Sequence, residues 1–545
     1  MTTANAYLTA RCLLALLTSG ALAGPLHRQI DQQLTTAASF SPRSDDAEFF
    51  RRVNLDFTGR IPDPAAVRAF LASTAPDKRS VLIDQLIASD AFATHWTDRL
   101  SVMLLERRDE GKVTDAAWRA YLTGLLREHP RWDKIVHDML AATGQGEARA
   151  AMKFWGKIDH HAATEDIARL FLGMDLKCVK CHDHPSVKDW EQRHYWGLYA
   201  YLNHTKEATN TKDKQAYLVE TVASKKVDFE SVFEVGKKQT GPQLPGRDEV
   251  PIPAFEEGEA FEQAAADGLP GVPKFRPRAL LARDMTDRDH TAFARNSVNR
   301  FWTLLMGRGL VHPLDQLHAK NPPSHPGLLE LLTRAFADHA FDIKWLLREI
   351  ALSEAYQRSS RLPEGVDRVE PASYRVALPK ALTPEQLLYA LLAGTGNREW
   401  VQAMQADPGA EAFDLKGYFT GTHAELPPSF ADVRKVFLQA FAAPPGEAEV
   451  DFVAGASKSL FLMNDRLILH WLQRHRNNLV DRLAALTTAG SVAEELYLSM
   501  LSRPPLAAET ETVSVYLAQN DKRRDEALSD LAWALLTSTE FRFNH

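Results

Sequence analysis

The pattern Cys178-x-x-Cys181-His182 constrains this chain more than any other feature of its sequence. The chain contains three cysteines, and the remaining one, Cys12, lies close to the N-terminus. Two thiols at positions i and i+3 lie on one face of a helical turn. So few cysteines exclude a small fold held together by a disulfide framework.

The motif is typical of covalent c-type haem attachment. Two thiols add to the two vinyl groups of one haem, and the histidine after the second thiol supplies an axial nitrogen to the iron. We therefore predict that the chain binds one covalent haem c. In this interpretation Cys178 and Cys181 are the anchors, and His182 is the proximal iron ligand.

Other chemistries fit the same short motif. The two thiols could form a structural or redox disulfide, or remain a buried reduced pair without function. They could also bind zinc together with His182 or His184 and one distant histidine, because structural zinc sites take four nitrogen or sulfur ligands. The residues of the motif leave these alternatives open.

The N-terminal residues favour export. Arg11 precedes an apolar stretch, Cys12 to Leu22, that is too short to cross a bilayer. Ala21-Leu22-Ala23 is typical of a signal-peptide cleavage site, although an ordinary N-terminal helix is the alternative. We predict that residues 1–23 are removed, that no integral membrane segment follows, and that the protein is exported to the periplasm or cell surface. Haem c is attached outside the bacterial cytoplasm, so the signal and the motif support each other.

Apolar residues recur at helical spacing on both sides of a middle segment of different composition. Asp63 before Pro64 is a plausible helix N-cap. Proline and glycine pairs and a partly alternating apolar stretch mark the middle segment as extended. We predict a mainly α fold, with two helical domains joined by a small extended or β-containing segment. The predicted parts are a signal peptide (1–23), a tether (24–45), a domain with the cysteine motif (46–205), the joining segment (206–275) and a C-terminal helical domain (276–545).

The charge balance limits the partners. The chain has 64 Lys and Arg against 71 Asp and Glu, which gives a net charge of −7. No long basic run is present, so we expect no binding of nucleic acid. Hydrophobic residues at 45% and charged residues at 25% are ordinary for a globular protein.

The sixth position on the iron separates an electron carrier from a catalyst or ligand sensor. We predict a distal histidine, with His161 or His160 ahead of His204. His194 is a further candidate near the motif. Met174 stands too close to the thiols along the chain to reach the far side of the ring.

Longer segments resemble two known families. Residues 49–62, FFRRVNLDFTGRIP, are similar to the opening of a planctomycete cytochrome-like domain of unknown function (PSCyt-type). Residues 171–198, which include the cysteine motif, match the corresponding segment of that family. The second half resembles the partner domain of unknown function (PSD-type) that usually follows it. The matching segments there include residues 299–302, 307–311 and 322–326.

The resemblance implies an exported protein of a family without assigned activity, from bacteria rich in secreted polysaccharide-degrading enzymes. Together with the motif it predicts electron transfer or redox chemistry in the periplasm, with an unidentified redox partner. The alternative is a non-redox secreted enzyme or binding module linked to polysaccharide breakdown. In that case the cysteine pair is a disulfide or zinc site, and Asn299, Arg300 and His325 line a ligand cleft. Whether the chain is an enzyme stays open at this point.

Overall fold

The computed structural model describes residues 24–35, 39–405, 412–422, 425–449, 455–475 and 477–545. The predicted signal peptide, residues 1–23, lies outside the described residues. Helices dominate the described part, and each of its sheets has two strands. The prediction of a mainly α fold is therefore confirmed.

The N-terminal half is a succession of short helices. They are α2 (Leu26–Leu34), α3 (Asp46–Thr58), α4 (Pro64–Ala72), α5 (Lys78–Ala88), α6 (Asp90–Leu105), α7 (Asp115–Glu128), α8 (Trp132–Ala141), η1 (Glu147–Trp155), α9 (His160–Ile167), η2 (Ala168–Leu172), η3 (Cys178–Lys180) and α10 (Gln192–Leu202). Side-chain caps fix several of these boundaries. Asp63 accepts hydrogen bonds from the first N–H groups of α4, as predicted.

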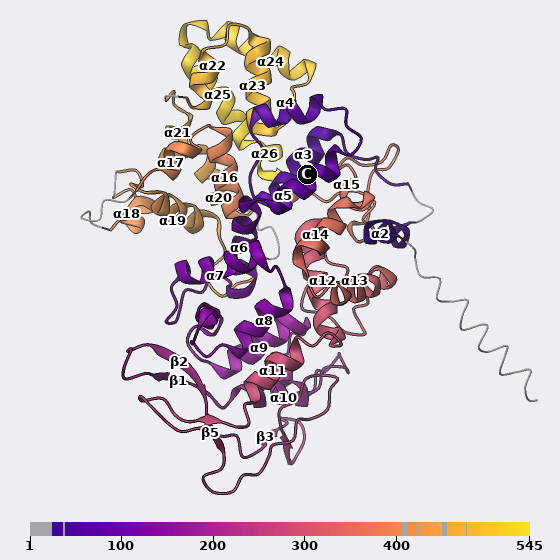
Figure 1. Ribbon diagram of the computed structural model, residues 1–545. Coiled ribbons are helices and arrows are strands. Elements are labelled where there is room, and N and C mark those ends of the chain that lie inside the picture. The colour runs from indigo at the N-terminus through magenta and orange to yellow at the C-terminus, as the bar shows by residue number, and fades with distance from the viewer. Residues whose placement is uncertain (1–23, 36–38, 406–411, 423–424, 450–454, 476) are drawn as a thin grey trace, which may run out of the picture.

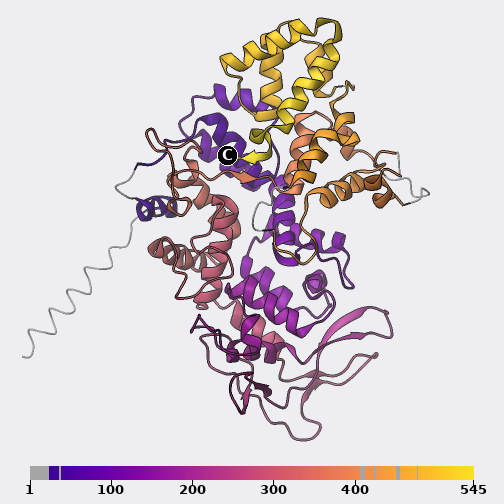
Figure 2. The same ribbon diagram turned by 180° about the vertical axis from the view of Figure 1, so that it is seen from behind.

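Three antiparallel hairpins follow α10 and form one end of the molecule. Their strands are β1 (Thr205–Thr209), β2 (Ala216–Glu220), β3 (Val227–Glu230), β4 (Lys237–Thr240), β5 (Phe261–Gln263) and β6 (Val272–Pro273). The molecule is elongated, and helices of the C-terminal region lie at the opposite end from these strands (Figure 1, Figure 2).

The second half is again helical. Its first elements are α11 (Pro277–Met285), α12 (Thr291–Met306), α13 (Pro326–Asp338), α14 (Ile343–Leu352), α15 (Glu354–Gln357) and η4 (Pro371–Ser373). The later elements are β7 (Lys380–Ala381), α16 (Pro384–Gly394), α17 (Arg398–Gln402), α18 (Leu415–Thr420), α19 (Phe430–Phe441), α20 (Ala456–Asn464), α21 (Arg466–Leu472), α22 (Leu479–Ala484), α23 (Ala489–Leu501), α24 (Ala507–Gln519), η5 (Asp521–Arg523), α25 (Arg524–Thr537), α26 (Thr539–Arg542) and β8 (Phe543–Asn544).

Two large clusters of buried apolar side chains form the interior. The first contains residues of the N-terminal helices together with residues of α11–α15. Phe301 of α12, for example, lies 5.4 Å from Trp132 and 6.2 Å from Trp96, measured between ring centroids. The second cluster is built from α16–α26, together with Leu55 and Ile61. The interior therefore does not divide at residues 206–275, and the domain boundaries stay a prediction.

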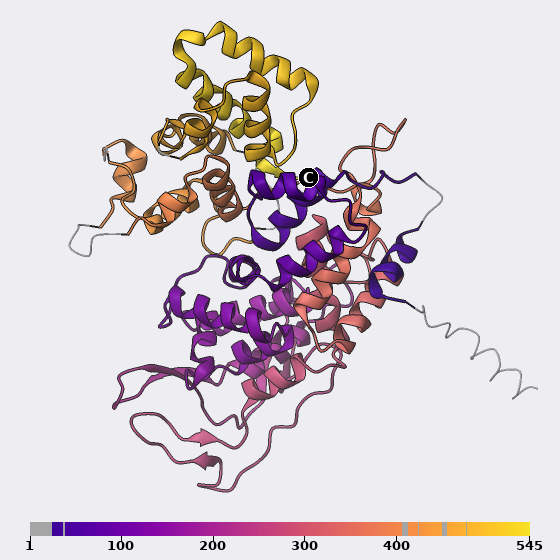
Figure 3. The same ribbon diagram turned by 45° about the horizontal axis from the view of Figure 1, so that its top comes forward.

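Part of the predicted tether is a docked helix. Leu26, Ile30 and Leu34 form one buried face of α2, which packs against α13 and α14 (Figure 3). Asp31 accepts two backbone N–H groups at the start of α15, at 3.0 and 3.1 Å. The apolar spacing of four residues was a sequence signal for this helix that the sequence analysis missed.

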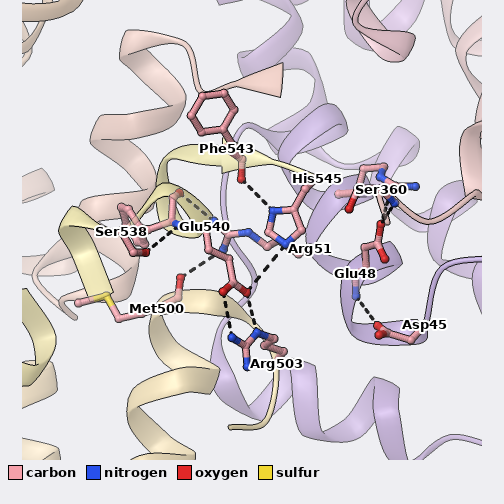
Figure 4. A network of polar contacts seen from close by, with 12 residues as sticks. Asp45, Glu48, Arg51, Ser360, Met500, Arg503, Ser538, Glu540, Phe543 and His545 are labelled. Carbon is pink, nitrogen blue, oxygen red and sulfur yellow. Dashed lines mark hydrogen bonds and ion pairs between the residues drawn. The ribbon is translucent and has the colours of Figure 1, made fainter. Parts of the chain in front are cut away.

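Helix α3 carries the first resembling segment and connects distant parts of the chain. Arg51 is buried and donates to the carbonyl oxygens of Met500 at 3.2 Å and Phe541 at 3.0 Å. Beside it, Arg503 and Glu540 form an ion pair at 2.6 Å (Figure 4). The motif therefore has a structural role, because it joins the N-terminal helices to the last residues.

Asp56 on the same helix accepts three side chains from the second half. Lys380 lies at 2.6 Å, the hydroxyl of Tyr356 at 2.7 Å and the amide of Asn544 at 2.8 Å. All four side chains have little contact with solvent. A buried carboxylate needs such partners, because an unpaired charge in the interior is costly.

No helix within the described ranges is both long and apolar enough to span a membrane.

Candidate functional site

The two thiols of the cysteine motif lie together at the surface. Cys178 begins the short 3-10 helix η3, and Cys181 follows its last residue. In a 3-10 helix the side chains at i and i+3 are eclipsed, so both thiols point to the same side. Both are exposed, and neither forms a disulfide.

Hydrogen bonds from neighbouring segments fix the backbone of this turn. The side chain of Val179, which stands between the two cysteines in the sequence, is fully buried. The carbonyl of Lys180 accepts the indole N–H of Trp196 at 3.1 Å and the side-chain amide of Gln192 at 3.2 Å. The carbonyl of Cys181 accepts a backbone N–H from the β3–β4 loop at 3.0 Å. These contacts fix the backbone that carries the exposed thiols, although the motif lies outside the long helices.

His182 is half-buried, and a hydrogen bond orients its ring. Its Nδ1 lies 2.7 Å from the backbone carbonyl of Asp183, which makes Nδ1–H the donor. Metal-ligating histidines commonly donate one ring nitrogen to a carbonyl in this way, which directs the lone pair of the other nitrogen to the metal. The side chain of Asp183 accepts the backbone N–H of Gln192 at 2.7 Å, so the histidine is tied to the start of α10.

His184 has a different role from His182. Its Nδ1 accepts backbone N–H groups of Ser186 and Val187, at 3.3 and 3.0 Å. Its ring lies edge-on to Trp190 with a centroid distance of 5.5 Å. These contacts stabilise the turn after the motif, so this histidine is engaged structurally.

The structure brings no zinc-ligand set together around the thiols. Across the described ranges, no group of three or more His, Cys, Asp and Glu side chains is arranged to hold a metal ion. A haem iron takes four of its ligands from the porphyrin, so haem attachment does not need such a group.

An apolar loop lies beside the motif, and sequence reasoning did not connect the two. Strands β3 and β4 form a hairpin, and its loop exposes Val232, Phe233 and Val235, with Phe233 79% exposed. The Phe233 ring lies 4.9 Å from the imidazole of His182. The sequence signal that could have indicated this surface is the group of three apolar residues, Val232, Phe233 and Val235, within a segment rich in charged residues.

Of the predicted distal ligands, His161 is connected to the cysteine motif through its neighbours. His161 stacks on Tyr199 with a centroid distance of 4.7 Å, and its Nδ1 lies 2.7 Å from the hydroxyl of Tyr195. It also meets the edge of Trp196, whose indole donates to Lys180 inside the motif. Burial, and to a smaller extent the charge of Lys180, lower the pKa of His161.

The other candidate distal histidines form hydrogen bonds with groups outside the cysteine motif. Nε2 of His160 lies 2.8 Å from the carbonyl of Thr205, and Nδ1 of His204 lies 3.4 Å from the hydroxyl of Thr221. His194 caps the start of α10 through its own Nδ1. Of the predicted distal residues, His161 is thus joined to the motif through one intervening side chain. The assignment of a distal ligand stays a prediction.

Comparison with known families identifies both halves of the chain. Residues 25–207 match the model of PSCyt2, described as a protein of unknown function (DUF1549). Residues 277–517 match PSD1, also described as a protein of unknown function (DUF1553). The chain therefore carries a PSCyt2 domain followed by a PSD1 domain. This confirms the resemblance seen in the sequence. No curated protein and no solved structure matches the chain.

The PSD1 domain holds the PSCyt2 segment that leads to the cysteines. Gly173 has a left-handed φ of 69°, and a Cβ built there would overlap the side chain of Leu317 and lie 2.8 Å from Asn296. The backbone N–H of Leu317 donates to the carbonyl of Gly173 at 2.9 Å, and that of Asp175 donates to the carbonyl of Asp315 at 3.0 Å. A glycine is required here because the two domains meet backbone to backbone.

The three residues that the alternative function places in a ligand cleft do not line a common cavity. Asn299 is buried and exchanges two hydrogen bonds of 2.9 Å with the backbone of Val311. Arg300 donates to the carbonyl of Arg169 at 2.7 Å. His325 occupies the N-cap position of α13 without a capping hydrogen bond from its side chain. The cavity that Arg300 lines contains neither Asn299 nor His325.

Proposed function

We propose that this protein binds one covalent haem c and transfers electrons outside the cytoplasm. The carrying observation is the combination of two free, exposed thiols on one side of a rigid turn with the oriented imidazole of His182. When bound, the haem supplies an iron that changes its charge by one electron. This proposal includes export of the chain, because haem c is attached after translocation.

The donor set suits this group. Cys178 and Cys181 face one side, as two vinyl groups of one ring require. Asp183 fixes the tautomer and the direction of the His182 ring, so that Nε2 remains for the iron. Each of these residues has a distinct role, because two anchor the ring, one binds the metal and one orients that ligand.

The β3–β4 loop supports the same proposal. Val232, Phe233 and Val235 expose apolar surface to water next to the thiols, which is unfavourable for a loop without a partner. A porphyrin is flat and largely apolar, and it would cover part of this surface. The loop would then exclude water from one side of the iron, and solvent exposure is one of the factors that set a haem potential.

For the sixth position we favour His161. Its lowered pKa keeps the imidazole neutral at neutral pH, as a metal ligand must be. Iron binding requires a rotation that breaks its hydrogen bond with Tyr195 or uses the other ring nitrogen. His182 and His161 would then both hold the iron, and the haem would supply electron transfer with little rearrangement.

The test is production of the full chain in a bacterial host with a cytochrome c maturation system. We expect a red protein whose Soret absorbance stays with the polypeptide after acid-acetone extraction. The C178A/C181A variant should lose the covalent colour, whereas H184A, whose ring stabilises only the turn, should keep it. A colourless wild-type protein whose two cysteines are oxidised to a disulfide would overturn the proposal.

Replacement of His161 separates the ligand assignment from the haem assignment. H161A should retain the covalent haem but change from a low-spin to a high-spin ferric spectrum, and it should bind cyanide readily. H204A serves as the matched control and should keep the wild-type spectrum. A low-spin H161A protein would show that another residue is the sixth ligand.

A further inference from the structure

A second site of unassigned role lies between helix α6 and elements of both halves of the chain. On α6, the residues His95, Arg99 and Met103 follow one another at helical spacing and line a cavity together with Glu106, the residue after the helix. Side chains of η2, α12, the start of α16 and residues 448–449 form the remaining walls. The free space between these walls is about 700 Å³, including the opening of the cavity to solvent. The cavity therefore admits a molecule of a few heavy atoms.

The acidic side chains of this cavity are already neutralised. Arg107 donates to Glu385 at 2.8 and 3.1 Å, and to Glu449 at 2.5 and 2.9 Å. Glu106 pairs with Arg169 at 2.7 Å. These carboxylates are therefore occupied by arginines that lie around the cavity.

Asp98, the remaining carboxylate of the wall, is neutralised in the same way. Arg119 lies 2.6 Å from it and Arg434 lies 3.0 Å from it. On the cationic side, Arg300 is bound to Asp315 and to a backbone carbonyl. The ion pairs thus account for the charged wall residues, with one exception.

The exception is Arg99. Among the described residues its guanidinium has neither a hydrogen bond nor an ion pair, although it lines the cavity. Burial lowers its pKa, and the carboxylates that act on it from a distance, Asp56, Glu385 and Glu449, are bound to other cations. The Arg99 side chain is half-buried, and its five N–H donors, which no described protein group accepts, are available to a ligand in the cavity.

The neighbour of Arg99 on the helix supports an anionic ligand. His95 is 5% exposed, and its pKa lies well below the ordinary value because of burial and then because of the charges of Arg99 and Arg60. At this end of the cavity the cationic Arg99 therefore lies beside a neutral imidazole. The opposite part of the wall is apolar, with Val102, Met103, Leu304 and Leu314.

We propose that this cavity binds a small organic carboxylate. Its two oxygens accept hydrogen bonds from the guanidinium of Arg99, which matches a carboxylate in geometry. Its short hydrocarbon part contacts Val102, Met103 and Leu304. The proposal does not depend on the haem, because the residues that carry it lie on α6 and α12 and the cysteine motif contributes none of them.

The experiment is calorimetric titration of the full chain with acetate, propionate and butyrate, and with butanol and butylamine as uncharged and cationic counterparts. We expect the carboxylates to bind with affinity that rises with chain length, and the two counterparts not to bind. R99Q should weaken butyrate at least about tenfold, the size expected for loss of one charge-assisted contact. R127Q, which removes an exposed arginine of α7, is the control and should bind as wild type.

A second variant covers the case in which R99Q does not fold. L304F keeps every charge and fills the apolar end, so it should abolish butyrate binding while circular dichroism stays unchanged. The proposal is overturned if no carboxylate of the series binds the wild-type chain. It is equally overturned if butanol binds as well as butyrate, or if folded R99Q or L304F binds butyrate with wild-type affinity.

Discussion

The ring of Phe233 lies 4.9 Å from the imidazole of His182, although the two residues lie in different loops that are far apart in the sequence. The contact is possible because the β3–β4 hairpin brings its loop back to the turn that carries the thiols. In the same loop, the backbone N–H of Val232 donates to the carbonyl of Cys181 at 3.0 Å. The loop is therefore part of the candidate haem site.

The contact between Phe233 and His182 predicts how a polar residue in the loop changes the reduction potential of the haem. Replacing Phe233 by Ser should expose the iron to water, which stabilises the ferric state and lowers the reduction potential by an amount on the order of tens of mV. Protein-film voltammetry of the haem-loaded protein measures the shift. L506S, which changes an exposed apolar residue before α24, should leave the potential unchanged. Equal potentials for F233S and wild type would show that the loop does not cover the haem.

The cluster at Asp56 predicts a large loss of stability. D56A removes the common acceptor of Lys380, Tyr356 and Asn544. It leaves the buried ammonium of Lys380 without its charged partner, with the carbonyl of Leu305 at 2.6 Å still accepting from it. Breaking a buried pair from one side costs about 3–5 kcal/mol. Urea denaturation should show this decrease in the free energy of unfolding. E526A, which breaks an exposed pair with Arg523, should cost less than about 1 kcal/mol.

The close approach at Gly173 predicts a selective effect of an added methyl group. G173A combines a left-handed φ of 69° with contacts to Leu317 and Asn296 that leave no room for a Cβ. G421A has a similar φ of 76° but no neighbour within 4 Å, so it reports the backbone strain alone. We expect G173A to lower the free energy of unfolding by at least about 1 kcal/mol more than G421A. Equal losses would contradict the packing between the two domains.

Burial of His95 predicts a pH dependence of stability. Its pKa in the folded chain lies well below the value of about 6.5 that it has when unfolded. The unfolded chain therefore binds the proton first, and stability falls as the pH decreases below about 6.5. Thermal unfolding between pH 7.5 and about 5 should show this decrease, and H95Q should show a smaller one. A variant with the same slope as wild type would mean that His95 is protonated in the folded state.

The sequence predicted the features that depend on neighbouring residues. The spacing of Cys178 and Cys181 predicted that the thiols share one side, and Asp63 was predicted as a helix cap. The features that it missed depend on contacts between distant segments. Neither the loop at Phe233 nor the unpaired state of Arg99 follows from local pattern, because each depends on how segments far apart in the sequence pack together.

The docked helix α2 is an intermediate case. Leu26, Ile30 and Leu34 show a helical apolar spacing, but the segment is short and also polar. Short helices are marginal alone and need tertiary packing. The contacts with α13 and α14 supply that packing, and no local sequence pattern contains them.

The central claim is that Cys178 and Cys181 carry haem through two thioether bonds. The most direct measurement is the mass of the peptide that contains residues 178–182, taken from protein made with a cytochrome c maturation system and treated with a reductant and a thiol-blocking reagent. The account predicts a peptide heavier by the mass of one haem, with neither thiol blocked. A peptide with two blocked thiols and no haem would contradict it.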